Sequence, residues 1–220
     1  MNSVIERVNN VCQCVRLSNN GPITFKKLVG SIRREFRLHN FDILVKTKKE
    51  KTLSDEEFYV NAYYDAEDDS NDDTAIEVIV YHNFSDLSNF TTVQITEFLR
   101  EIFDATVHEF KHQHQSIKRD YKTYTNHDNS PFEDYLSDPD EVDAYALSIA
   151  IELLRHMSEQ RAKWAMTRLT IMSRMRHGTI FVSPNLNVYV AHFGQSPIIK
   201  RLAKKVYKHL GTLDTGHIFK

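Results

Sequence analysis

The chain has 220 residues, 41% of them hydrophobic, and a formal net charge of −2 at pH 7. This length allows one large domain or two small ones with a substantial core. The near-neutral charge, without a lysine- or arginine-rich run interleaved with aromatic residues, excludes the electrostatic signature of a protein that binds nucleic acid or an anionic membrane. Six Gly and five Pro are few, which favours long regular elements, helices in particular.

The cysteines and the N-terminal segment indicate in which cellular compartment the protein is expected. Cys12 and Cys14 are too close for ordinary disulfide geometry and too few for a structural zinc site. Glu6 and Arg7 interrupt the apolar positions of the N-terminal segment, so the hydrophobic region of a signal peptide is absent. No run of eighteen apolar residues predicts a transmembrane helix. We therefore expect a soluble cytoplasmic protein without a membrane or nucleic-acid partner.

Hydrophobic periodicity predicts one helix and three strands in the first part of the chain. Residues 22–37 carry apolar side chains at helical spacing, with Pro22 at the first turn. Residues 41–47, 57–65 and 74–82 are rich in β-branched and aromatic residues and predict three strands of an antiparallel sheet. The acidic run between the last two strands lacks the Gly and Glu of a calcium-binding loop and predicts a solvated hairpin loop.

Helical periodicity returns from residue 91. One long helix is predicted over residues 91–119, followed by a long loop over 120–138. Asp138 and Pro139 are then a helix cap and a first helical residue, and their helix runs to about Met157. Further helices are predicted over 158–175 and 197–210. The simplest organisation is a single domain over 1–220, with a catalytic core at about 22–156 and a helical C-terminal part at 157–220.

The stretch ATVHEFKHQHQ, residues 105–115, places His108, Glu109 and His112 in the spacing H-E-x-x-H. Random placement in a chain of this composition gives that motif only about 0.03 times. Residues i and i+4 lie on one face of a helix, so both imidazoles can bind one ion at ~2.0–2.1 Å. Glu109 is placed to act on a metal-bound water rather than to bind the metal. The motif therefore predicts a site for one Zn²⁺ per chain.

Two imidazoles make a weak metal site, so the prediction needs a third ligand. A histidine six residues after the motif is ruled out, because Lys118 stands there. Glu141, in PDEVDAYA, lies on the next predicted helix, far enough downstream for the chain to turn back. Ala144 on the same face allows the two helices to approach closely. Asp140 and Glu133 are weaker rival ligands.

HEFKH, PDEVDAYA and the order of elements resemble the zincin metallopeptidases, in particular short gluzincin-like proteins, over about residues 22–156. The resemblance implies an α+β fold with an N-terminal helix and a three-stranded, mostly antiparallel sheet. The H-E-x-x-H helix, a Glu helix and further C-terminal helices follow. The resemblance also implies that His108, His112 and Glu141 bind the metal and that Glu109 is the general base. The element order is similar to that of small metallopeptidase-like proteins of bacteriophages.

Further roles follow from the same resemblance and, for Tyr145, from helical spacing. Zincins hold the substrate backbone along an edge strand, and the strand at 74–82, with Ile76, Val78 and Val80, is the candidate because it precedes the H-E-x-x-H helix. Tyr145, one turn after Glu141, is positioned to hydrogen-bond a ligand imidazole. The donor to the oxyanion stays open among Tyr121, Tyr124, His127, Tyr135 and Tyr189.

These residues favour a zinc-dependent metallopeptidase that acts on a peptide or protein substrate in the cytoplasm, which is the host cytoplasm if the protein is viral. A purely structural metal site has no use for a carboxylate beside its ligand, so Glu109 favours catalysis. Two alternatives stay open. One is a non-catalytic metal-binding module, such as a regulator or a virion-assembly component, and the other is a metallohydrolase that cleaves a non-peptide amide or ester.

Overall fold

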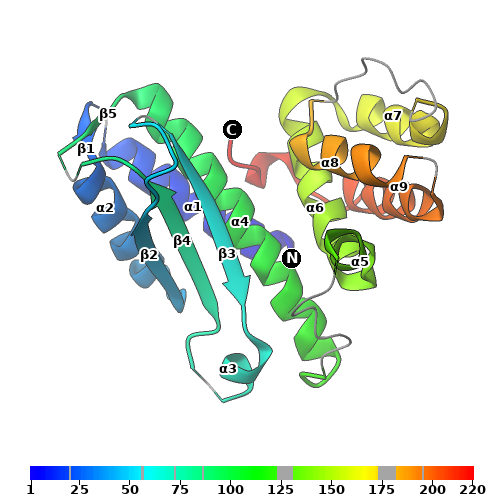
Figure 1. Cartoon of the computed structure of the whole chain (residues 1–220), viewed down its shortest axis with the longest axis horizontal. Helices are drawn as coiled ribbons and strands as arrows, with labels where there is room; N and C mark the ends of the chain where they lie inside the picture. The colour runs from blue at the N-terminus through cyan, green and yellow to red at the C-terminus, as the bar shows by residue number, and fades with distance from the viewer. Residues whose placement is uncertain are drawn as a thin grey trace. The chain divides into compact units, whose positions relative to one another are not determined.

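The computed structural model describes residues 1–19, 21–55, 57–71, 73–85, 87–122, 131–172, 182–194 and 196–220, without the side chains of 170–172. The chain divides into two compact units. The first comprises Met1–Thr123 and Phe219–Lys220, and the second comprises Tyr124–Ile218. The first unit combines helices with strands and the described part of the second is helical, which confirms the α+β class at this coarse level (Figure 1).

The predicted helices and strands occur in the predicted order, interspersed with elements that were not predicted. The first unit contains α1 (Asn2–Ser18), β1 (Ile23–Thr24), α2 (Phe25–Leu38), β2 (Ile43–Lys49), β3 (Phe58–Tyr64), α3 (Ala66–Ser70), β4 (Ile76–His82), β5 (Asn89–Phe90) and α4 (Thr92–Lys118). The second unit contains α5 (Phe132–Ser137), α6 (Pro139–His156), α7 (Glu159–Met172), α8 (Pro184–Phe193), α9 (Pro197–Leu210) and a short 3₁₀ helix, η1 (Thr215–His217). All three predicted strands are confirmed, with boundaries shifted by one or two residues.

The main sheet of the first unit is mixed, so the expected mostly antiparallel sheet is wrong in one of its two pairings. The strand order is β2-β4-β3. β3 and β4 form the predicted antiparallel hairpin, whereas β2 runs parallel to β4, with Ile43 opposite Ile76. β2 and β3 follow one another in sequence, yet they lie on opposite sides of β4.

β4 is therefore the central strand, and the proposal that Ile76, Val78 and Val80 form a substrate-binding edge strand is wrong. All three side chains are buried on the inner face, as their alternation predicted. The outer faces of β2 and β3 are mostly exposed, while the outer face of β4 is half-buried. The most apolar strand takes the centre because only there do both backbone edges find hydrogen-bonding partners.

Helices cover one face of this sheet. α2 contacts β2, and α4 contacts β3 and β4, while α1 packs against both helices (Figure 1). The helix α1 was not predicted from the sequence, where Glu6 and Arg7 served only to exclude a signal peptide. One face of α1 buries Ile5, Val8 and Val15 at helical spacing, which is an ordinary amphipathic pattern.

Two loop predictions need correction as well. The acidic hairpin loop contains α3, a single short helix capped by Asp65, whose side chain accepts hydrogen bonds from two backbone N–H groups. The predicted loop over 120–138 contains α5. Both helices are shorter than two turns, so they carry too few residues for a periodic signal.

α6 is the core of the second unit, in contact with α5, α7, α8 and α9. Most of its side chains from Val142 onward are buried on all sides of the helix, as expected for a helix surrounded by others. Buried Glu152 accepts hydrogen bonds from Ser183 and, at 2.6 Å, from Asn185, which ties the start of α8 to α6. Even so, neither α6 nor another helix in the described ranges is long and apolar enough to cross a membrane.

Candidate metal centre

The H-E-x-x-H motif lies in the C-terminal half of α4, a helix of 27 residues. α4 begins with a capping box in which Thr91 and Gln94 satisfy each other's backbone N–H groups. A buried stripe that includes Phe98, Ile102 and Val107 then anchors the helix in the core of the first unit. This anchoring fixes the rotation of the helix and hence the direction of the motif's side chains.

The structure brings the two motif histidines together. The Nε2 atoms of His108 and His112 lie 3.1 Å apart, and their ring centroids lie 4.9 Å apart with an angle of 65° between the rings. Two nitrogen ligands of one tetrahedral zinc ion, each at 2.0–2.1 Å, are separated by about 3.3–3.4 Å. The pair is therefore within a few tenths of an ångström of the spacing that a shared metal ion requires.

Glu109 is buried in the same turn of α4, with 8% of its surface exposed. His114, the third histidine of the segment, is also partly shielded, and this burial, followed by the charges of Lys118 and Lys111, lowers its pKa. His114 is two residues after His112 and thus points to a different side of the helix. The arrangement separates the predicted base and the predicted ligands from this third histidine.

Glu141 belongs to the second unit and lies in the first turn of α6. The predicted cap is confirmed, because the Asp138 side chain accepts a hydrogen bond from the backbone N–H of Asp140 at 2.7 Å and Pro139 is the first helical residue. A first-turn carboxylate also interacts favourably with the helix dipole. Tyr145, one turn later, packs edge to face against Tyr189 at 5.4 Å.

Two other acidic residues of the second unit, Asp143 and Glu133, contact basic side chains. Asp143 contacts Lys205 at 3.3 Å and His209 at 3.1 Å. Glu133, one of the rival ligands, lies 3.5 Å from His192. Asp140 offers its backbone to the cap and has a partly buried side chain.

The candidate oxyanion donors fall into three groups. Tyr189 is fully buried and donates its hydroxyl hydrogen to the Leu136 carbonyl at 2.9 Å, so it does not offer this hydroxyl to a substrate. Burial also raises the pKa of Tyr189. Tyr135 lies on α5, where it stacks on Phe132 at 6.3 Å. Tyr121 lies three residues after the end of α4, and His127 and Tyr124 lie outside the described residues.

Glu101 is a residue that the sequence interpretation missed. Its carboxylate accepts a hydrogen bond from the backbone N–H of Val60 at 3.1 Å. A side chain of α4 thus satisfies a backbone N–H group on the outer edge of β3, which is an edge strand. Burial raises the pKa of Glu101 to about 7; the Val60 bond opposes this rise, while the charges of Asp104 and Glu97 add to it. A charged residue flanked by the buried Leu99 and Ile102 was the available signal.

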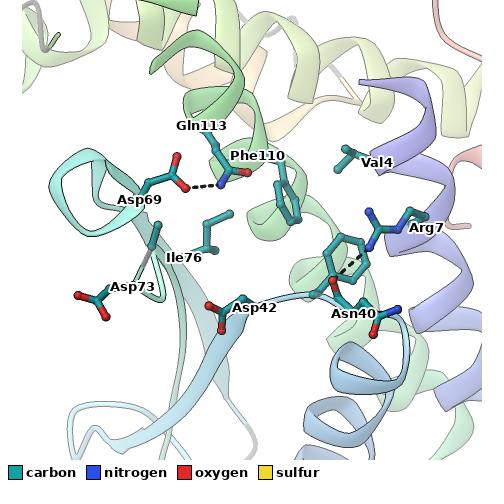
Figure 2. A pocket seen from close by; sticks show the side chains of 11 residues that line it. Val4, Arg7, Asn40, Asp42, Asp69, Asp73, Ile76, Phe110 and Gln113 are labelled. Carbon is teal, nitrogen blue, oxygen red and sulfur yellow. Dashed lines mark hydrogen bonds between the residues drawn. The ribbon is translucent and has the colours of Figure 1, made fainter. Parts of the chain in front are cut away.

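An open hollow of about 360 Å³ lies elsewhere in the first unit. Figure 2 shows Asp42, Asp69 and Asp73 on one side of it and Arg7 on the other. Asp69 is held by Gln113 at 2.9 Å and by the Tyr64 hydroxyl at 2.8 Å. Neither motif histidine lines this hollow, so it is separate from the candidate metal ligands.

Comparisons with protein-family models, with curated proteins and with solved structures found no match to this chain. The assignment of a function therefore depends on the chemistry of the residues themselves. The geometry supplies one strong element, the imidazole pair on α4. It supplies two further residues of suitable chemistry, Glu109 beside that pair and Glu141 at the start of α6.

Proposed function

We propose that the chain is a zinc-dependent metallopeptidase that hydrolyses peptide bonds. The observation that carries the proposal is the 3.1 Å separation of the His108 and His112 Nε2 atoms on successive turns of α4, with Glu109 between them in sequence. Glu141 is the proposed third ligand. Two imidazoles and one carboxylate are a donor set that suits a catalytic zinc ion, because a fourth position stays open for water.

Each side chain then has a distinct task. A Zn²⁺ ion held by His108, His112 and Glu141 would lower the pKa of its water toward about 7 and polarise the substrate carbonyl. Glu109 accepts the proton of the attacking water on its carboxylate and passes it to the nitrogen of the leaving amine. Each imidazole would hold the ion through the lone pair of a ring nitrogen. Since α4 is anchored along its whole length, these groups keep their positions during the reaction.

The experiment that tests this proposal replaces Glu109 by Gln. The variant should retain zinc, measured by elemental analysis, while cleavage of fluorescently labelled casein should fall by roughly 10²–10⁴-fold, the usual contribution of a general base. Glu97→Gln, an exposed glutamate on the same helix, is the matched control and should keep full activity. Full activity in the Glu109→Gln variant would end the proposed mechanism.

A non-catalytic metal-binding module is the second candidate. The observation in its favour is the burial of Glu109, because a carboxylate that is only 8% exposed also suits a structural role beside the ligands. On this alternative, the wild-type protein binds zinc but cleaves neither casein nor a mixed peptide library analysed by mass spectrometry. The Glu109→Gln change would then lower zinc affinity or stability instead of a reaction rate.

A further inference from the structure

A second group of metal-binding side chains lies in the first unit, on α1 and at the end of α2. Cys14 is on α1, Glu35 is in the last turn of α2, and His39 directly follows that helix. The Cys14 Sγ and His39 Nε2 atoms are 4.0 Å apart. A sulfur, an imidazole nitrogen and a carboxylate oxygen from these three residues all lie within 4.8 Å of one another.

The carboxylate of Glu35 is the unusual member of this group. Only 7% of Glu35 is exposed, and its neighbour Arg34 donates two hydrogen bonds, at 2.9 and 3.1 Å, to the same oxygen, Oε1. Within the described ranges no donor is bonded to Oε2. The Arg34 side chain is 58% exposed, so solvent screens its charge. The second oxygen is thus left to accept another positive group.

The turn after α2 is held firmly in place. Arg7 donates hydrogen bonds to the carbonyl oxygens of Asn40, at 3.3 Å (Figure 2), and of His39, at 2.8 Å. Its guanidinium also stacks over the Phe41 ring. Asn40 has a φ of 54°, which closes the turn in the left-handed region. The His39 imidazole is therefore presented to α1 by a fixed backbone, as a metal ligand needs.

The two cysteines have different surroundings. Cys12 is completely buried, and its thiol donates a hydrogen bond to the Leu99 carbonyl at 3.6 Å, so it is a core residue. Cys14 is partly exposed and has the His39 ring as its hydrogen-bonding neighbour. A thiol in that position can lose its proton to bind a metal without leaving a buried charge.

We infer that Cys14, Glu35 and His39 form a second site for one Zn²⁺, independent of the H-E-x-x-H motif. Thiolate, imidazole and carboxylate are the three ligand types that zinc uses in proteins. In a tetrahedral site their donor atoms are separated by roughly 3.2–3.6 Å, so a shift of a few tenths of an ångström closes the 4.0 Å gap between sulfur and nitrogen. Water occupies the fourth position. The ion links α1 to the C-terminal end of α2.

Cobalt is the probe that separates this site from the one on α4. Co²⁺ replaces Zn²⁺ with the same geometry, and a thiolate ligand adds a charge-transfer absorption band in the near ultraviolet. Only the Cys14 site contains sulfur. The full chain, stripped of metal with a chelator, is titrated with CoCl₂, and the band is then displaced with ZnCl₂.

The expected result is a saturable band in the wild type, in Cys12→Ser and in the His108→Ala/His112→Ala variant. The band should be lost in Cys14→Ser, and His39→Ala and Glu35→Gln should weaken cobalt binding at least tenfold. Circular dichroism of each variant verifies that the first unit is folded. Absence of the band in the wild type, or its persistence in a folded Cys14→Ser protein, would overturn the inference. Because the motif variant keeps the band, failure of this site and failure of the peptidase proposal are distinguishable.

Discussion

The first unit carries the histidine pair of one candidate metal site and all three residues of the other, and the two sets are built in different ways. His108 and His112 lie on successive turns of one helix, so the hydrogen bonds of α4 alone set their spacing. Cys14, Glu35 and His39 come from two helices and a turn, so their proximity depends on how α1 packs against α2. The first group is a local feature of the chain, and the second exists only in the folded unit.

The largest expected effect concerns metal content. We predict two zinc ions per chain in the wild type and one in each of two variants, His108→Ala/His112→Ala and Cys14→Ser. The first variant should also lose all hydrolysis of casein, because two of its three ligands are gone. Cys14→Ser should retain hydrolysis, because the sulfur site lies outside the proposed catalytic group. Elemental analysis measures the zinc content, and a casein assay measures the hydrolysis. A single zinc ion per wild-type chain would show that one of the two proposed sites does not bind zinc.

The next largest effect is a loss of stability from the core of the first unit. Phe98 on α4 is fully buried, with the rings of Phe25, Phe58 and Phe90 at 6.2, 5.1 and 5.8 Å. Phe98→Ala should lower the free energy of unfolding by about 3–5 kcal/mol, through lost burial and the cavity left behind.

Urea unfolding of the Phe98→Ala protein also separates the two metal groups. If the first unit unfolds cooperatively, the cobalt–thiolate band and the zinc bound by the α4 histidines should be lost at the same urea concentration. Zinc that stays bound after the thiolate band has gone would show that α4 keeps its histidine pair without the packing of α1 on α2.

The same distinction explains what the sequence predicted. The three strands, α4 and α6 all have strong apolar patterns, and the Asp138–Pro139 pair is a direct signal for a helix start. The His108–His112 spacing is likewise visible, because four residues are one turn of a helix. These features depend on residues that are close together in the sequence, so the sequence alone predicts them.

The unpredicted features depend on contacts between distant segments. Nothing within residues 43–49 and 58–64 indicates that β4 enters between these two strands, because strand order is decided by which strand buries both of its edges. Cys14 and His39 are 25 residues apart, and no fixed spacing connects them. α1 is the exception, since its buried face has a readable period that the charges of Glu6 and Arg7 concealed.

A smaller effect is expected from pH, through Glu101. The pKa of Glu101 in the folded protein is about 7, above the ordinary value of 4.5. Between pH 4.5 and pH 7 the folded protein therefore binds a proton on Glu101 that the unfolded protein does not. The contribution of Glu101 to the free energy of unfolding is therefore fully present below about pH 4.5 and is lost as the pH rises through 7. After allowance for partial solvent exposure, we expect a loss of about 1–2 kcal/mol between pH 5 and pH 8.

Glu101→Gln should remove this pH dependence while keeping an acceptor for the Val60 N–H. Urea unfolding at pH 5, 6.5 and 8 measures the difference between the two proteins, which cancels the contributions of other titrating groups. A constant difference across this range would mean that Glu101 is charged throughout in the folded state. The hydrogen bond between α4 and β3 would then be an ordinary charged one.

The smallest effect tests the start of α6, where Glu141 lies. Asp138→Ala removes the side chain that accepts a hydrogen bond from Asp140 N–H, and should destabilise the helix by about 1 kcal/mol. The first turn then frays, so Glu141 is held less firmly and zinc affinity, measured by competition with a chromophoric chelator, should fall a few-fold. Asp138→Asn keeps an acceptor oxygen at the cap and should restore most of both quantities. Lower stability with unchanged zinc affinity would argue against Glu141 as a ligand, because a metal-binding carboxylate in a frayed turn cannot keep its geometry without cost.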